Sequence, residues 1–333
     1  MERIIKKLTE TYGPSGREDR IREVIKEEVS KLADEIRTDY LGNLIVLKKG
    51  TASEQTKPVM LAAHMDEIGI MITHIDKEGF LRITNVGGLT PARLIGARFV
   101  LPSGQKGVVF HEPLKELKEL DLEKMYLDIG AENQEEAKKH VTIGDIAVAD
   151  EPMVSLGNRL IAKAMDDRIG CVVLIEALKK IKNNPNDIYF VFTTQEEVGI
   201  RGAKTSAFGL NPGLGIAVDV TMTGDTPEAK KMDVKLGGGA AIKVKDSSLI
   251  TSPIVKDKMV EIAEKEKIKY QLEVLSRGGT DAGAINLTRE GILAGCISIP
   301  CRYVHSPAEM VDKGDVEAAV KLLVKMIEEK IDF

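Results

Sequence analysis

The segment at positions 188 to 199 reads IYFVFTTQEEVG, and it places two carboxylates directly after an apolar run. The run is rich in β-branched and aromatic residues, which predicts a buried strand. Glu196 and Glu197 follow it, and a carboxylate that is buried without a partner is costly. We therefore expect a positive group to meet these two side chains at the carboxyl end of a core strand.

The flanking sequence alternates predicted strands with predicted helices. Strands are expected at 44–47, 59–63, 188–194, 214–220 and 292–299, and helices at 16–33, 168–183, 252–267 and 313–331. Ser15 and Glu18 have the S-x-x-E spacing of a capping box, which predicts the start of the first of these helices. This alternation is typical of a three-layer α/β/α domain with a largely parallel sheet.

Residues 71–159 have a different pattern. Short β-like runs are expected at 71–74, 80–83, 99–101, 107–110 and 146–148, with helical pattern only near 114–124 and 133–139. Glycine and proline punctuate these runs, which predicts a small all-β module. We expect it to be inserted between two parts of the α/β domain, 1–70 and 160–333, and to contact another subunit.

Composition limits the possible partners. The chain carries 47 basic and 52 acidic residues, a formal net charge of -5, and the two signs are interspersed, so we expect no nucleic-acid partner. No segment has the ~18 to 20 consecutive apolar residues of a membrane helix, and the N-terminus lacks the apolar core of a signal peptide. We therefore expect no membrane partner and a cytoplasmic location.

Several strand-like runs end in side chains that can bind a metal ion. These are His64, Glu196 with Glu197, Asp219 and His305. Ligands of open α/β sheets bind outside the carboxyl ends of the strands, so these residues are expected to converge. Asp166 and Asp167 stand at a predicted helix start, where one can be an N-cap and the other a further ligand. Imidazoles and carboxylates together suit Zn²⁺, Co²⁺ or Mn²⁺.

The number of candidate ligands favours two metal ions. A single catalytic zinc usually takes about three protein ligands plus water, whereas a carboxylate bridge allows two ions ~3.5 to 4 Å apart. One glutamate of the adjacent pair can then bind metal while the other acts as general base, which requires a backbone turn at 196–197. Asp66, two residues after His64, is expected to orient that imidazole.

Other candidates have simpler explanations. His74, His111 and His140 lack a nearby carboxylate and are interpreted as structural, and Asp219 could instead be a buried hydrogen-bond anchor. The glycine-rich segment 276–284 lacks the spacing of a phosphate-binding loop, so it is interpreted as a substrate-facing or structural turn. The serines lack a nucleophile-elbow motif, and the three cysteines are interpreted as reduced core thiols.

Six ordered motifs carry a family likeness. They are AAHMDEIG, GNRLIAKAMDDRIG, TTQEEVGIRGA, AVDVT, RGGTDAGA and IPCRYVHSPAEM. Together they resemble the M42 family of dinuclear metallo-aminopeptidases, the tetrahedral aminopeptidase group, from PSGRE near the N-terminus to HSPAEM. The segments VGGLTPARLIG and IGDIAVAD are similar to that family's inserted PDZ-like dimerisation domain. The resemblance implies a three-layer α/β/α metallopeptidase domain interrupted by this module.

The resemblance also implies a role for each site residue. His64 and Asp219 would bind one metal ion, Glu197 and His305 the other, and Asp166 would bridge them. Glu196 would be the general base, Asp66 would orient His64, and Gly279, Thr280 and Asp281 would lie beside the substrate. Two divalent ions per subunit are implied, Zn²⁺ or Co²⁺ first and Mn²⁺ as a third choice. Family members commonly form dimers that assemble into hollow tetrahedral dodecamers, which restrict access to short peptides.

The predicted function is therefore an aminopeptidase that removes N-terminal residues from short peptides, with a metal-bridged water as nucleophile. Neutral aliphatic N-terminal residues are the default expectation. One alternative is a metal-independent glycosidase of the endoglucanase type, although its two carboxyls would have to face each other ~5 to 9.5 Å apart across the sugar bond. The other alternative is a non-catalytic peptide-binding scaffold that uses the β module.

Overall fold

A large mixed sheet forms the centre of the protein. The computed structural model describes residues 1–51 and 57–330. The sheet contains β1 (Glu35–Thr38), β2 (Leu44–Lys48), β3 (Val59–His64), β10 (Val154–Leu156), β11 (Arg159–Ala162), β12 (Ile188–Thr193), β13 (Leu214–Thr221), β14 (Ala240–Lys245), β15 (Tyr270–Val274), β16 (Leu293–Arg302) and β17 (Glu309–Asp312). The order is β1-β2-β12-β3-β13-β16-β17-β11-β10, and β14 joins β16 to β15. Because β12, β3, β13 and β16 run parallel, their carboxyl ends lie at one edge.

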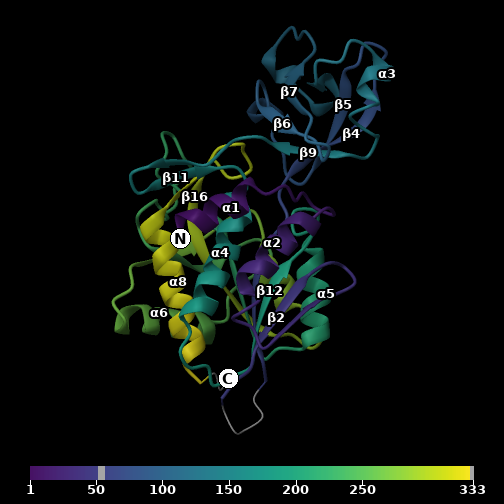
Figure 1. The fold of residues 1–333 in the computed structure, drawn as a ribbon. Coiled ribbons are helices and arrows are strands. Elements are labelled where there is room, and N and C mark those ends of the chain that lie inside the picture. The colour runs from purple at the N-terminus through teal and green to yellow at the C-terminus, as the bar shows by residue number, and fades with distance from the viewer. Residues whose placement is uncertain (52–56, 331–333) are drawn as a thin grey trace.

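Helices cover both faces of this sheet. They are α1 (Glu2–Glu10), α2 (Asp19–Val29), α4 (Met165–Lys180), α5 (Arg201–Leu210), α6 (Pro253–Lys265), α7 (Asp281–Asn286) and α8 (Lys313–Glu328). Alternate residues of β3 enter different cores: Leu61 belongs to the core that contains residues of α4 and α8, whereas Met60 belongs to the core that contains residues of α5 and α7. Figure 1 shows α5 and α8 on opposite sides of the sheet. The predicted three-layer α/β/α architecture is confirmed.

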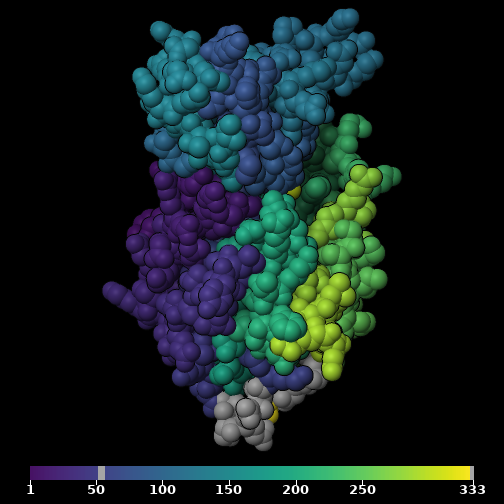
Figure 2. Space-filling view, turned by 90° about the vertical axis from the view of Figure 1, so that its right-hand side faces the viewer, coloured from purple at the N-terminus to yellow at the C-terminus, as the bar shows by residue number. Residues whose placement is uncertain are grey.

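A closed antiparallel barrel interrupts the α/β part. Its strands are β4 (Gly69–Ile75), β5 (Leu81–Val86), β6 (Arg98–Val100), β7 (Lys106–His111), β8 (Met125–Asp128) and β9 (Ile146–Ala149), in the order β4-β5-β8-β7-β6-β9. Short helices η1 (Pro91–Arg93), η2 (Leu117–Glu119), η3 (Leu122–Lys124) and α3 (Gln134–Ala137) connect them. Ile70, Phe99 and Leu127 belong to a separate apolar core. The predicted all-β insertion is present, and Figure 2 shows it in blue and teal as a lobe at one end.

Several local predictions need correction. The capping box is not formed, and α2 begins only at Asp19, because Ser15 and Glu18 hydrogen-bond to the loops around Asp66 and Gln195 instead. The predicted helix at 114–124 is two separate 3-10 turns. The domain limits stay a prediction, although β10 already pairs with β11 in the large sheet. The predicted end of the last helix at 331 lies outside the described residues. Within the described ranges, no helix combines the length and the apolar character needed to cross a membrane.

Candidate active site

The parallel strands deliver the predicted ligands to one edge of the sheet. His64 is the last residue of β3, Asp219 lies near the end of β13, and the two glutamates follow β12. His305 follows β16, and Asp166 lies at the start of α4. All the residues predicted to bind metal line one cleft with Glu196.

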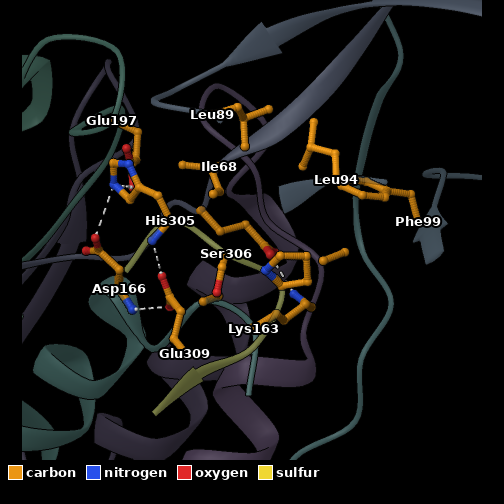
Figure 3. A pocket seen from close by; sticks show the side chains of 14 residues that line it. Ile68, Leu89, Leu94, Phe99, Lys163, Asp166, Glu197, His305, Ser306 and Glu309 are labelled. Atoms are coloured by element: carbon orange, nitrogen blue, oxygen red, sulfur yellow. Dashed lines mark hydrogen bonds and ion pairs between the residues drawn. The ribbon is translucent and has the colours of Figure 1, made fainter. Parts of the chain in front are cut away.

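Asp166 lies between the two imidazoles. Its Oδ1 is 3.0 Å from His64 Nε2, and its Oδ2 is 3.3 Å from His305 Nε2. The same His305 nitrogen is 3.2 Å from Glu197 Oε1, and Figure 3 shows His305 next to Glu197 and Asp166. One carboxylate that presents an oxygen to each imidazole has the arrangement that a bridging ligand requires.

Two overlapping sets of side chains lie close enough to hold metal ions. Ligand atoms of His64, Asp166 and Glu197 lie within 4.8 Å of one another, and so do those of His64, Asp167 and Asp219. However, both oxygens of Asp167 already accept backbone N–H groups, Oδ1 from Gly170 and Oδ2 from His64. Asp167 therefore caps the helix and ties it to β3, which leaves Asp166 free to face the cleft.

A turn after β12 allows the adjacent glutamates to face the same site. Gln195 has a φ of 54°, and this left-handed residue ends the extended backbone. The N–H groups of Glu196 and Glu197 donate to Asp66, at 3.0 Å to Oδ1 and 3.3 Å to Oδ2. Within the described residues the Glu196 carboxylate has no hydrogen-bond partner, so it stands free at the cleft.

Asp66 also contacts the imidazole of His64. His64 Nδ1 lies 3.2 Å from the Asp66 backbone oxygen and 3.5 Å from its Oδ1. Nδ1 therefore faces Asp66, and Nε2 is directed at Asp166. Asp66 is 0% exposed, so this contact is shielded from water. Such a contact is the usual way to fix the orientation of a metal-binding imidazole.

The carboxylates of the site outnumber its two imidazoles, which are the groups of the cluster that can carry positive charge. Burial raises the pKa of Glu196, Glu197 and Asp219, and neighbouring carboxylates raise each of them further. Burial lowers the pKa of His305, but hydrogen bonds to Asp166 and Glu197 outweigh it and raise the value to about 12. A metal ion bound beside these buried carboxylates would stabilise their charged forms.

The predicted substrate-facing residues lie at different depths. Gly279 lines the cleft, whereas Thr280 and Asp281 are buried behind it. Asp281 Oδ2 accepts a 2.6 Å hydrogen bond from Thr193, the last residue of β12. Within the described residues, Asp281 Oδ1 and Thr280 Oγ1 are buried without a partner. Their role in substrate binding stays a prediction.

Sequence reasoning missed two residues that hydrogen-bond to the backbone at or next to the predicted ligands. Glu309 accepts the N–H of Asp166 at 2.9 Å and that of His305 at 2.7 Å. Arg93 of the barrel lobe donates to the backbone oxygen of Val304 at 2.5 Å. Glu309 belongs to the HSPAEM motif, which was a usable signal for its importance. No sequence pattern indicated the contact made by Arg93, because it joins residues more than 200 positions apart.

The α/β/α fold and this cluster of imidazoles and carboxylates suit a hydrolase that binds divalent metal ions. The family model described as M42 glutamyl aminopeptidase matches residues 42–322, so the chain belongs to the M42 peptidase family. It is therefore an enzyme of the aminopeptidase class, and membership of this family implies divalent metal ions.

Individual relatives support this assignment. A protein of Acetivibrio thermocellus that is predicted to be an aminopeptidase is 53% identical over 97% of both chains. The lysyl aminopeptidase of Pyrococcus furiosus is 36% identical, over 98% of this chain and 96% of that protein. Aminopeptidase APDkam598 from Desulfurococcus kamchatkensis superposes with a TM-score of 0.95 at 43% identity, over 98% and 94% of the two chains. The TET1 peptidase of Pyrococcus horikoshii superposes with a TM-score of 0.89 at 36% identity, over 99% of each chain. That peptidase can assemble into a tetrahedron or a large octahedral shell.

Proposed function

We propose that this protein is a dinuclear metal-dependent aminopeptidase that removes N-terminal residues from short peptides. The observation that carries the proposal is the Asp166 carboxylate between His64 and His305, one oxygen towards each ring. His64 and Asp219 would hold one ion, Glu197 and His305 the other, and Asp166 would bridge them.

The residues present fit two divalent ions. Two imidazoles and three carboxylates form a hard-to-borderline donor set, which suits Zn²⁺ or Co²⁺ and accepts Mn²⁺. Burial and neighbouring carboxylates raise the pKa of Glu197 and Asp219, so their charged forms are disfavoured unless a cation lies close to them. When bound, the two ions would polarise the scissile carbonyl and lower the pKa of a water molecule.

Glu196 is the proposed general base. Its carboxylate lines the cleft and has no hydrogen-bond partner among the described residues, so it is free to accept a proton and pass it to the leaving amine. Asp66 is the proposed orienting residue for His64, because it faces Nδ1 and directs Nε2 to the ligand cluster.

The cleft is suited to a short peptide. Its volume is about 820 Å³, within the usual range for small-ligand sites. Apolar side chains line it beside the ligand cluster, namely Leu89, Ile200, Val220, Met222, Leu275 and Val304. This lining supports the preference for neutral aliphatic N-terminal residues, with Gly279 beside the peptide.

We propose in addition that the protein forms homo-oligomers. The support is its similarity, over nearly the whole of both chains, to a peptidase that assembles into a tetrahedron. The barrel lobe is the proposed dimerisation surface, and dimers would build a tetrahedral dodecamer. A native mass measurement tests this, and a monomer at working concentration would contradict it.

Metal dependence and the Glu196→Gln variant test the proposed reaction. Chelation is expected to abolish hydrolysis of leucine anilide, and Zn²⁺ or Co²⁺ to restore it. Glu196→Gln is expected to bind two ions per chain but to lose about 10²- to 10⁴-fold in kcat. Chelator-resistant cleavage of a β-glucan would favour the glycosidase alternative, and substantial activity in Glu196→Gln would show that the base is another residue.

A further inference from the structure

The N-terminal segment 13–18 is docked against the loop that carries Asp66. The N–H of Ser15 donates to the backbone oxygen of Glu67 at 3.3 Å. In return, the N–H of Glu67 donates to the backbone oxygen of Gly13 at 3.1 Å. Ser15 is 6% exposed and Glu18 is 4% exposed. Although this segment is remote in sequence from every predicted site residue, two of its polar side chains are buried next to the site.

Ser15 holds the carboxylate of Asp66. Its Oγ donates a 2.6 Å hydrogen bond to Asp66 Oδ2. The same carboxylate accepts the N–H groups of Glu196 and Glu197. Because Asp66 is fully buried, the Ser15 hydroxyl restricts the rotation of a carboxylate that fixes the main chain of both glutamates.

Glu18 holds the residue that starts the turn. Its Oε1 accepts the N–H of Gly16 at 2.7 Å and the N–H of Gln195 at 3.1 Å. Together with the two contacts to Asp66, this means that three successive N–H groups, those of 195, 196 and 197, donate to carboxylates from outside the turn. Gln195 needs such support, because its φ of 54° is unfavourable for a residue with a side chain.

We propose that Ser15 and Glu18 are positioning residues for the general base. The Glu196 carboxylate has no side-chain or backbone partner in the described part of the chain, so its place in the cleft depends on its own main chain. A displacement of about 1 Å in a reacting group can cost about 100-fold in rate. This inference rests on the proposed function, because it assumes that Glu196 is the base.

The test compares alanine variants at both positions with a neighbouring control. Ser15→Ala and Glu18→Ala are each expected to lower kcat on leucine anilide about 10- to 100-fold, with little change in KM and still two ions bound per chain. Arg17→Ala is the control, since Arg17 lies between them, is exposed and donates its side-chain hydrogen bond to the backbone oxygen of Gly16. Ser15→Thr keeps the hydroxyl and Glu18→Gln keeps the accepting oxygen, so both are expected to retain most of the wild-type kcat.

The outcomes separate this inference from the proposed function. If the wild-type protein loaded with metal hydrolyses no anilide, the proposed function fails. If the wild type is active and both alanine variants, measured per folded molecule, match Arg17→Ala in kcat, the positioning role is wrong. The same conclusion follows if they lose thermal stability alone. If Ser15→Ala does not fold, the test uses Glu18→Ala together with Glu18→Asp, whose side chain is shorter. The same fall in kcat is expected for both.

Discussion

Glu309 accepts the backbone N–H of Asp166 at 2.9 Å through Oε2. Its other oxygen accepts the N–H of His305 at 2.7 Å, so one buried side chain sets the spacing of two proposed ligands that come from different elements. Figure 3 shows Glu309 next to both residues.

Glu309→Gln is expected to weaken metal binding about 10- to 100-fold, because Glu309 accepts the two N–H groups with different oxygens, and in glutamine one of these oxygens is replaced by an NH₂ group that cannot accept. Calorimetric titration of the metal-free protein with Zn²⁺ measures the effect. Glu317→Gln is a matched control on the exposed face of α8. Equal affinities in the two variants would contradict the supporting role of Glu309.

Much of the fold could be predicted because it depends on local pattern. The apolar runs at 59–63 and 188–194 are covered on both faces, and their carboxyl ends place His64 and Glu196 at one edge. The capping box at Ser15 and Glu18 was wrongly predicted because it, too, was inferred from local spacing. The Ser15 hydroxyl instead donates to the buried carboxylate of Asp66, 51 positions away. Long-range hydrogen bonds of this kind leave no periodic signal in a single sequence.

Lys243 and Glu273 form an ion pair in which both side chains are fully buried. Thr221, the last residue of β13, donates to the same Glu273 oxygen at 2.8 Å, so the pair connects three strands near the cleft. Lys243→Met is expected to lower the free energy of unfolding by about 3 to 5 kcal/mol, because it leaves a buried carboxylate unpaired. Chemical denaturation measures this. The double variant Lys243→Met/Glu273→Leu is expected to recover most of the loss, and a double variant as unstable as the single one would show that the charge is not the cause.

Asp225 and Arg302 predict a pH dependence of stability. Burial raises the pKa of Asp225, but hydrogen bonds led by that from Arg302 outweigh it and lower the value to about 2. An aspartate in the unfolded chain has a pKa of about 4. The pair therefore stabilises the fold fully above about pH 4, and this contribution is lost as the pH falls from 4 towards 2.

Asp225→Asn is expected to lower the free energy of unfolding by about 1 kcal/mol at neutral pH, since the pair is partly exposed. The difference from the wild type should shrink as the pH approaches 2. Arg302→Gln is expected to show the same trend. A difference that is constant between pH 2 and 6 in denaturation experiments would contradict the linkage.

Arg277 is expected to influence which N-terminal residue is accepted. It lines the cleft, and among the described residues its guanidinium has no hydrogen-bond or ion-pair partner. Arg277→Glu is expected to lower the ratio of kcat/KM for glutamate anilide over lysine anilide by about 10-fold, with leucine anilide changed little. Lys31→Glu reverses an exposed charge on the segment after α2 and serves as control. The effect should weaken at high salt, and equal ratios in the two variants would exclude Arg277 from substrate selection.

Gly88 shows that the barrel lobe contributes to the active site. It follows β5, and a Cβ atom at this position would lie 2.7 Å from His305 Nδ1, closer than van der Waals contact allows. Gly88→Ala is therefore expected to displace either the loop or the imidazole, and to lower both Zn²⁺ affinity and kcat/KM about 10-fold or more. Gly209→Ala is the matched control, because a Cβ there meets no atom within 4 Å. If Gly88→Ala matches the control in Zn²⁺ affinity and in peptide turnover, the loop after β5 can shift without displacing His305. The lobe would then not constrain the position of this imidazole.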